Sequence, residues 1–133
     1  MGWIRNRVFK KMFTEQSADG VSAALNVYQK PFVTICVATE GSASFTIKFQ
    51  MSIDKAQPDF SAAKSVSNKW DYVCVYDYED GVLIAGDTGI SFSGADDVRY
   101  FRLNTDLIEW FSVELSSYSA GKATVTIVSA DGP

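Results

Sequence analysis

The sequence contains no histidine, and only two cysteines and three prolines occur among its 133 residues. Without histidine the chain cannot form a Ser-His-Asp triad or a Cys-His pair, and it lacks the most common transition-metal ligand. It also lacks the side chain that most often acts as a general base near neutral pH. We therefore expect a protein that is not an enzyme and that holds no metal or other cofactor.

Long apolar runs are also missing. No stretch approaches the roughly 20 apolar residues that a transmembrane helix requires. The opening MGWIRNRVFKKMF has neither the continuous apolar segment nor the cleavage site of a signal peptide, so we expect folding in a cytosol. Cys36 and Cys74 do not form a C-x-x-C motif, so neither a zinc site nor a redox motif is indicated. In a cytosol we expect both to be buried free thiols, with a disulfide between two strands as the alternative.

Charge is unevenly distributed along the chain. Arg5, Arg7, Lys10 and Lys11 lie within the first 13 residues, whereas the chain as a whole carries 16 acidic residues against 12 basic ones. An acidic body would repel a phosphate backbone, so we expect no nucleic-acid partner. The basic N-terminus could instead meet an acidic surface on a neighbouring protein.

The first residues show a spacing typical of a short amphipathic helix. Ile4, Val8 and Met12 are four residues apart, with Phe9 and Phe13 beside them. Such a helix could lie on a membrane surface, dock on its own domain or pack on a partner. Because a helix this short needs something to pack on, we predict an arm at residues 1–19, followed by a domain at 20–133. The predicted partner-binding residues of the arm are Trp3, Ile4, Arg5, Arg7, Val8, Phe9, Lys10, Lys11, Met12 and Phe13.

Beyond residue 20 the apolar residues alternate with polar ones. The clearest example is SFTIKFQMSI, in which Phe45, Ile47 and Phe49 share one face. Turn signals at 40–42, 79–81 and 119–121 predict hairpins. The pattern predicts an all-β protein, an antiparallel β-sandwich of jelly-roll type with eight or nine strands and a short helical or extended N-terminal arm; a barrel is the alternative.

A long loop interrupts the strands between Asp54 and Asn68. Loops of this length in compact domains often carry function, so we predict that Pro58, Asp59 and Phe60 form an interface loop.

A tripeptide further along the chain resembles a catalytic motif. Asp87-Thr88-Gly89 spells the tripeptide of aspartic proteases, but its flanking residues Gly86 and Ile90 favour a β-turn, and we predict no catalytic residue.

The acidic residues of the strand region suggest a possible calcium site, and the aromatic residues suggest a possible sugar-binding site. The carboxylates could bind calcium between loops, but solvated turns are the simpler interpretation. The aromatic residues could form a sugar-stacking platform, but core or interface positions are commoner for aromatics on strands. The acidic residues concerned are Asp77, Glu79, Asp80, Asp87, Asp96 and Asp97. The aromatic residues concerned are Trp70, Tyr72, Tyr76, Tyr100, Phe101, Trp110 and Tyr118.

Three segments, PDFSAAKSVSNKWDYVCVYDYEDG, IAGDTGISFSGADDVRYFRLNTD and WFSVELSSYSAGKATVTI, resemble small β-rich structural proteins of tailed bacteriophages. The resemblance covers residues 44–128 and implies a virion component of the capsid-decoration, neck or tail type, assembled in the host cytoplasm. It implies a homo-oligomer, possibly a trimer, with other virion proteins as partners and no nucleic acid or membrane. The alternative function is a carbohydrate-binding module that recognises a host surface.

Overall fold

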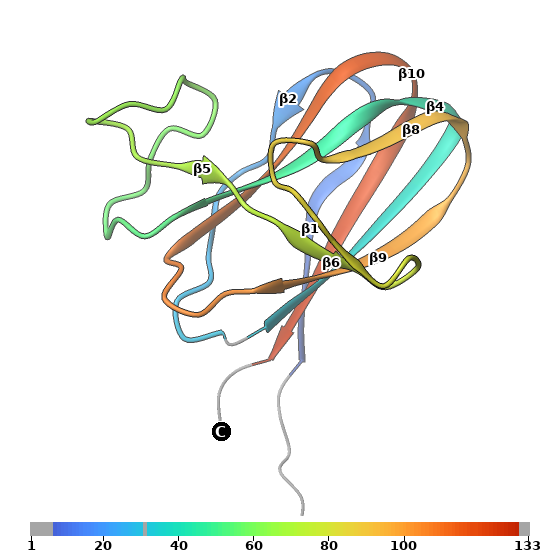
Figure 1. Ribbon diagram of the computed structural model, residues 1–133. Coiled ribbons are helices and arrows are strands. Elements are labelled where there is room, and N and C mark those ends of the chain that lie inside the picture. The colour runs from blue at the N-terminus through green and yellow to red at the C-terminus, as the bar shows by residue number, and fades with distance from the viewer. Residues whose placement is uncertain (1–6, 31, 131–133) are drawn as a thin grey trace, which may run out of the picture.

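A computed structural model describes residues 7–30 and 32–130 of the chain, and every regular element in them is a β-strand (Figure 1). This confirms the prediction of an all-β antiparallel sandwich. No helix that could cross a bilayer occurs in the described part. The strands are β1 (Arg7–Gln16), β2 (Gly20–Val21), β3 (Leu25–Asn26), β4 (Phe32–Ser52), β5 (Asp71–Tyr72), β6 (Val75–Asp77), β7 (Val82–Ile84), β8 (Ile90–Ala95), β9 (Val98–Asn104) and β10 (Trp110–Ala130).

The frame of the molecule is a pair of long strands that bend together. β4 and β10 have 21 residues each and pair antiparallel from Ser52–Trp110 to Val33–Ser129. Their pairing shifts register at 116–122, where Gly41 and Gly121 have positive φ angles of 77° and 80°. A Cβ atom on Gly121 would lie 2.5 Å from the Ala43 Cα, so the close approach of the two bends requires glycine there.

The predicted hairpins at 40–42 and 119–121 are therefore wrong. A glycine with positive φ serves a β-bulge as well as a hairpin turn, so the local signal is the same for both. Here each strand continues through the bend because the other strand bends beside it. β4 and β10 arch over the same corner in Figure 1. The predicted hairpin at 79–81 is present, between β6 and β7.

The bend folds the sheet into two facing layers. The first layer holds β1, the C-terminal half of β10, the N-terminal half of β4, then β9, β6 and β7. The second layer holds β2 and β3, the N-terminal half of β10, the C-terminal half of β4, then β8 and β5. The two halves of β4 and β10 thus supply the centre of both layers.

Alternate residues of the bent strands fill the space between the layers. Val33, Ile35 and Val37 point inward from the first half of β4 and are fully buried, while Phe49 does so from the second half. The Phe49 ring stacks on Phe111 with centroids 5.9 Å apart. The predicted inward face of the strand around residues 45–49 is therefore part of the core.

The N-terminal segment is a strand over residues 7–16, so the extended alternative of the predicted arm is the correct one and the helix indicated by the spacing is not present there. A spacing of four fits a period of two as well as a helical period, so the pattern did not separate the alternatives. β1 pairs with β10 along its length and, through a bulge near residue 12, buries both Met12 and Phe13. The described part of the predicted arm thus lies on its own domain. Trp3, Ile4 and Arg5 lie outside the described residues, and the division of the chain at residue 19 stays a prediction.

Candidate functional site

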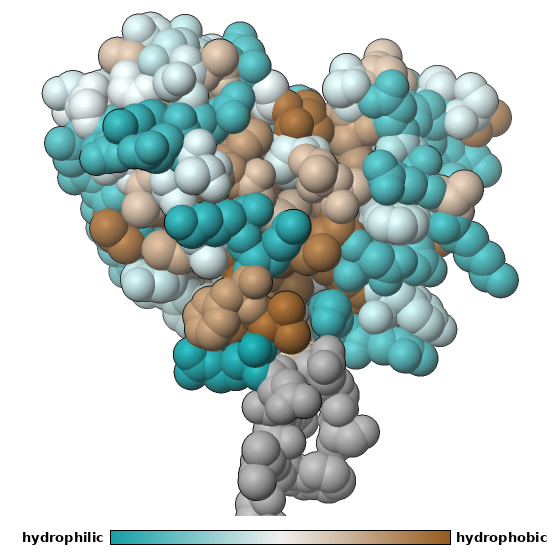
Figure 2. Space-filling model, turned by 180° about the vertical axis from the view of Figure 1, so that it is seen from behind, coloured by the Kyte–Doolittle hydropathy of each residue, from teal (hydrophilic) through white to brown (hydrophobic). Residues whose placement is uncertain are grey.

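Residues 53–70, between β4 and β5, form a loop that lies over the outer side of the second layer; we call it the cover loop. It stands out at the left of Figure 1 and belongs to the right-hand lobe of Figure 2, which is separated from the rest of the molecule by a furrow with apolar side chains at its base. Phe60 fixes the loop, because its side chain is buried and its carbonyl oxygen accepts a hydrogen bond from Gln50 Nε2 at 2.9 Å.

Two tryptophans hold the cover loop, one near its start at Lys55 and the other at Ala62 in its middle. Trp70 Nε1 donates a hydrogen bond to the Ala62 carbonyl oxygen at 3.0 Å, and Trp110 Nε1 donates one to the Lys55 carbonyl oxygen at 3.2 Å. The Trp70 ring also meets the Tyr72 ring edge-on, with centroids 5.1 Å apart. The loop therefore has a fixed conformation although it contains no strand or helix.

The predicted interface residues Pro58, Asp59 and Phe60 all lie in this loop. Pro58 and Phe60 are buried, so Asp59 is the exposed member of the three. Its carboxylate accepts hydrogen bonds from the backbone N–H of Ser61 at 3.0 Å and from the Ser61 hydroxyl at 2.5 Å, which lowers the pKa of Asp59. The three residues shape the loop, and their part in an interface stays a prediction.

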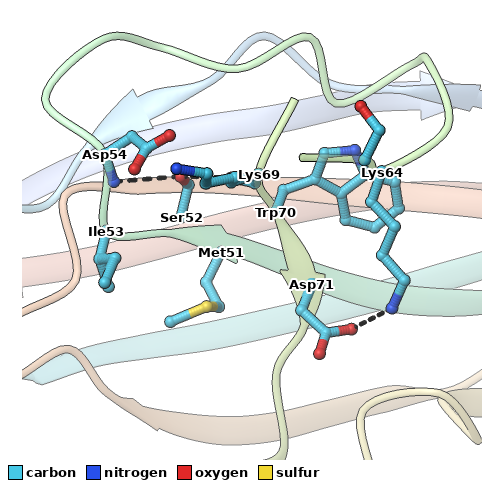
Figure 3. A pocket seen from close by; sticks show the side chains of 9 residues that line it. Met51, Ser52, Ile53, Asp54, Lys64, Lys69, Trp70 and Asp71 are labelled. Carbon is cyan, nitrogen blue, oxygen red and sulfur yellow. Dashed lines mark hydrogen bonds and ion pairs between the residues drawn. The ribbon is translucent and has the colours of Figure 1, made fainter. Parts of the chain in front are cut away.

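A hollow of about 620 Å³ lies between the cover loop and the end of β4. Figure 3 shows Met51 and Ile53 on one side of it and Trp70, Lys64 and Asp71 on the other. Lys64 Nζ lies 2.5 Å from Asp71 Oδ1, and this contact lowers the pKa of the Asp71 carboxyl. The lining residues are Met51, Ser52, Ile53, Asp54, Lys64, Ser65, Lys69, Trp70 and Asp71.

A second polar group lies beside the hollow, where β5, β4 and β10 run side by side. The Tyr72 hydroxyl is 3.0 Å from both carboxylate oxygens of Glu114, and Lys48 Nζ lies 4.9 Å from the centre of the Tyr72 ring. Burial, followed by the hydrogen bond to Glu114, raises the pKa of Tyr72 to about 12. The phenol therefore stays protonated and donates to the carboxylate.

No loop within residues 7–30 and 32–130 covers the outer side of the first layer, and we call this side the open face. One row of directly opposed residues crosses five strands, namely Phe9, Val128, Thr34, Arg102 and Tyr76. The next row is Lys11, Thr126, Cys36 and Tyr100.

Aromatic side chains stand exposed on the open face. Phe9 is 58% exposed, Phe32 is 52% exposed and Tyr100 is 50% exposed. The guanidinium of Arg102 lies 5.6 Å from the centre of the Phe32 ring and 5.5 Å from that of Tyr76, so aromatic rings flank the cation.

Toward the corner, the open face carries Glu40 and Lys122, which are directly opposed on β4 and β10 and form an ion pair, and Glu15 of β1 also pairs with Lys122. The described residues of its other rows on β1, β4, β9 and β10 include no acidic side chain, although the chain has a net charge of −4. The charged members of these other rows are Arg7, Lys11 and Arg102. Cys36 is half-buried in the middle of this face and Cys74 is exposed, so the expectation that both are buried is wrong; neither forms a disulfide. Sequence reasoning assigned aromatics to strands but missed this face, because which strands lie side by side depends on the bends.

Three of the acidic residues considered for calcium, Asp77, Glu79 and Asp80, surround the guanidinium of Arg99. Asp77 is fully buried and forms an ion pair with Arg99, whose Nε lies 2.9 Å from a Glu79 carboxylate oxygen. Asp96 instead accepts a hydrogen bond from the backbone of Ser42 at 2.8 Å. In the described part of the chain, no three acidic or cysteine side chains gather in a way that could hold a metal ion.

The Asp87-Thr88-Gly89 stretch forms a turn before β8, as its flanking residues indicated. The N–H groups of Thr88 and Gly89 both donate to the Ala85 carbonyl oxygen at 3.2 Å, and Asp87 is exposed. A Cβ atom on Gly89 would lie 2.7 Å from the Ile47 carbonyl oxygen. The glycine is therefore needed because the turn packs closely against β4.

No protein-family model and no curated protein matches this chain. Solved structures that are similar to it include two phage-derived proteins. The SPBc2 prophage-derived protein YomS matches with a TM-score of 0.69 and 12% identity over 98% of each chain. The PBSX exported protein XepA matches with a TM-score of 0.68 and 15% identity over 98% of this chain and 40% of XepA. At these identities the likeness shows a shared fold, and both neighbours are phage-derived proteins.

Proposed function

We propose that this protein is a structural component of a bacteriophage particle and that copies of it assemble through the open face. The observation that carries the proposal is the open face itself, an aromatic and basic surface that crosses five strands without a covering loop. The fold shared with two phage-derived proteins supports the phage association. The proposal includes no catalytic role, cofactor, nucleic acid or membrane partner.

Exposed aromatics on neighbouring strands are unusual for a protein that works alone. Monomeric proteins rarely expose large contiguous apolar patches, and interface cores are enriched in Tyr, Phe and Arg. Phe9, Phe32 and Tyr100 are each about half exposed and lie on three strands of one layer. Burial of such rings against another copy would remove them from water and stabilise the assembly.

The charge distribution favours a contact between different surfaces of two copies. Two open faces placed against each other would bring Arg7, Lys11 and Arg102 near the same cations of the partner. Exposed carboxylates lie at the corner, away from these three cations, for example Glu40, Asp96 and Asp97. A head-to-tail contact of this kind forms a ring when the rotation between copies closes, and a trimer is one such ring.

The N-terminal residues are proposed to reach other virion proteins. β1 is an edge strand of the first layer and begins at Arg7, opposite Ala130, so residues 1–6 precede an edge strand in the chain. Because Met12 and Phe13 belong to the core, removal of residues 1–19 would damage the fold. Deletion of residues 2–6 is the truncation that tests attachment, with a folded protein that fails to enter particles as the expected result.

Mass spectrometry of purified particles tests the proposal. Particles from bacteria that express the protein should contain it at a constant copy number through repeated purification. Loss of the protein during purification, while the major particle proteins are retained, would contradict a structural role.

A further inference from the structure

We propose that the hollow beside Trp70 binds a neutral saccharide. None of its lining residues belongs to the open face, so this inference does not depend on the assembly proposal. A volume of about 620 Å³ falls within the range of small-molecule sites and has room for one or two sugar rings.

Trp70 supplies a rigid platform. Its Nε1 bond to Ala62 and its packing against Phe60, with centroids 6.2 Å apart, and against Tyr72 fix the plane of the indole. The C–H groups on one face of a sugar ring are weakly positive and pack on the negative face of an aromatic ring. Since the indole is already held in place, binding does not have to immobilise it.

The polar groups around the hollow match hydroxyl groups. Asp54 and Asp71 offer acceptors, whereas Lys64 and Lys69 offer donors, and a sugar hydroxyl can both donate and accept. Lys64 and Asp71 hold each other in position at 2.5 Å. Met51 and the 69% exposed Ile53 provide an apolar wall opposite (Figure 3).

The balance of charge around the hollow favours a ligand without net charge. Two carboxylates and two ammonium groups line the hollow, so an anionic ligand would meet Asp54 and Asp71 and a cationic one would meet Lys64 and Lys69. A purely apolar ligand would remove these charges from water without replacing their hydrogen bonds, which is unfavourable. A polyhydroxylated ring satisfies both the indole and the charged groups.

A two-dimensional NMR titration of the full chain tests the site. The probes are glucose, galactose, mannose, N-acetylglucosamine, maltose and cellobiose, and we expect at least one to shift the Trp70 indole signal and the Lys69 and Asp71 amide signals saturably, with a Kd of about 1 mM. Tighter binding of a disaccharide than of its monosaccharide would indicate a glycan chain as the ligand, and equal binding would indicate a free sugar. Absence of saturable shifts at these residues for all six sugars would overturn the proposal.

A pair of variants separates stacking from loop stability. Trp70→Phe keeps an aromatic ring beside Phe60 but loses the larger platform, and we expect affinity to fall about fivefold or more. Trp110→Phe removes the equivalent indole bond to Lys55, yet Trp110 does not line the hollow, and we expect affinity within about twofold of the parent. Equal weakening in both variants would show that the platform assignment is wrong.

Discussion

The two outer faces of the sandwich differ in whether a loop of the chain covers them. On the second layer, the polar residues Gln50 and Ser52 are buried under the cover loop, where loop carbonyl oxygens accept their hydrogen bonds at 2.9 and 2.6 Å. On the first layer, aromatic residues such as Phe32 and Tyr100 stand exposed and nothing in the described chain covers them.

This contrast shows that hydrogen bonding, as well as hydrophobicity, decides which sheet face a loop covers. A loop can cover polar strand residues when its backbone supplies their partners. An aromatic face left without a cover within its own chain is then a surface that another molecule can bury.

The largest effect is expected from Arg99, which faces inward near the corner on β9. Arg99→Ala leaves the fully buried Asp77 without its cation, and we expect a loss of about 3 kcal/mol in the free energy of unfolding, measured by urea denaturation. The matched control is Arg102→Ala, on the open face of the same strand, with a loss below about 0.5 kcal/mol. Equal losses would contradict the assignment of the two arginines to different faces.

A smaller loss is expected when the cover loop is released. Phe60→Ala removes its 5% exposed anchor and should cost about 2 kcal/mol, because a surface loop can collapse around the vacated space, with faster proteolysis between residues 61 and 69. Val66→Ala, in the same loop at 89% exposure, should leave both readouts unchanged. If Phe60→Ala leaves the loop resistant to protease, the anchor lies elsewhere.

The pH dependence of stability reports on Tyr72. Its folded pKa of about 12 exceeds the ordinary value of 10, so the unfolded state loses its proton first as pH rises. The contribution of the neutral phenol is complete below pH 10 and is lost between pH 10 and 12. Because Tyr72 is only half-buried, we expect about 1 kcal/mol over this window. Urea denaturation at both pH values should show a smaller difference in Tyr72→Phe, and an unchanged difference would contradict the shift.

The sequence predicted the parts of this fold that depend on local alternation. The inward residues of β4 follow a period of two, and the length of the 54–68 segment identified the loop that became the cover loop. The bends at Gly41 and Gly121 were interpreted as hairpins because positive φ serves both structures, and residues 7–16 were interpreted as a helix because a spacing of four fits both periods.

The binding surfaces could be predicted less well, because each combines residues that are distant in sequence. The hollow joins the end of β4 to Trp70 and Asp71 across the cover loop, and the open face joins β1, β4, β9 and β10. Asp77 could have been noticed, since it takes an inward position two residues after buried Val75, where an acidic residue needs a partner.

The role of the open face is tested most directly by the oligomeric state of the full chain in solution, measured by size-exclusion chromatography with light scattering. The parent protein should be an oligomer, and Phe32→Ser with Tyr100→Ser should be a monomer with a melting temperature within about 2 °C of the parent, since both side chains are surface-exposed. Ile53→Ser with Val66→Ser removes two exposed apolar residues from the cover loop and should leave the oligomer intact. A monomeric parent, or dissociation by the cover-loop pair and not by the open-face pair, would contradict the account.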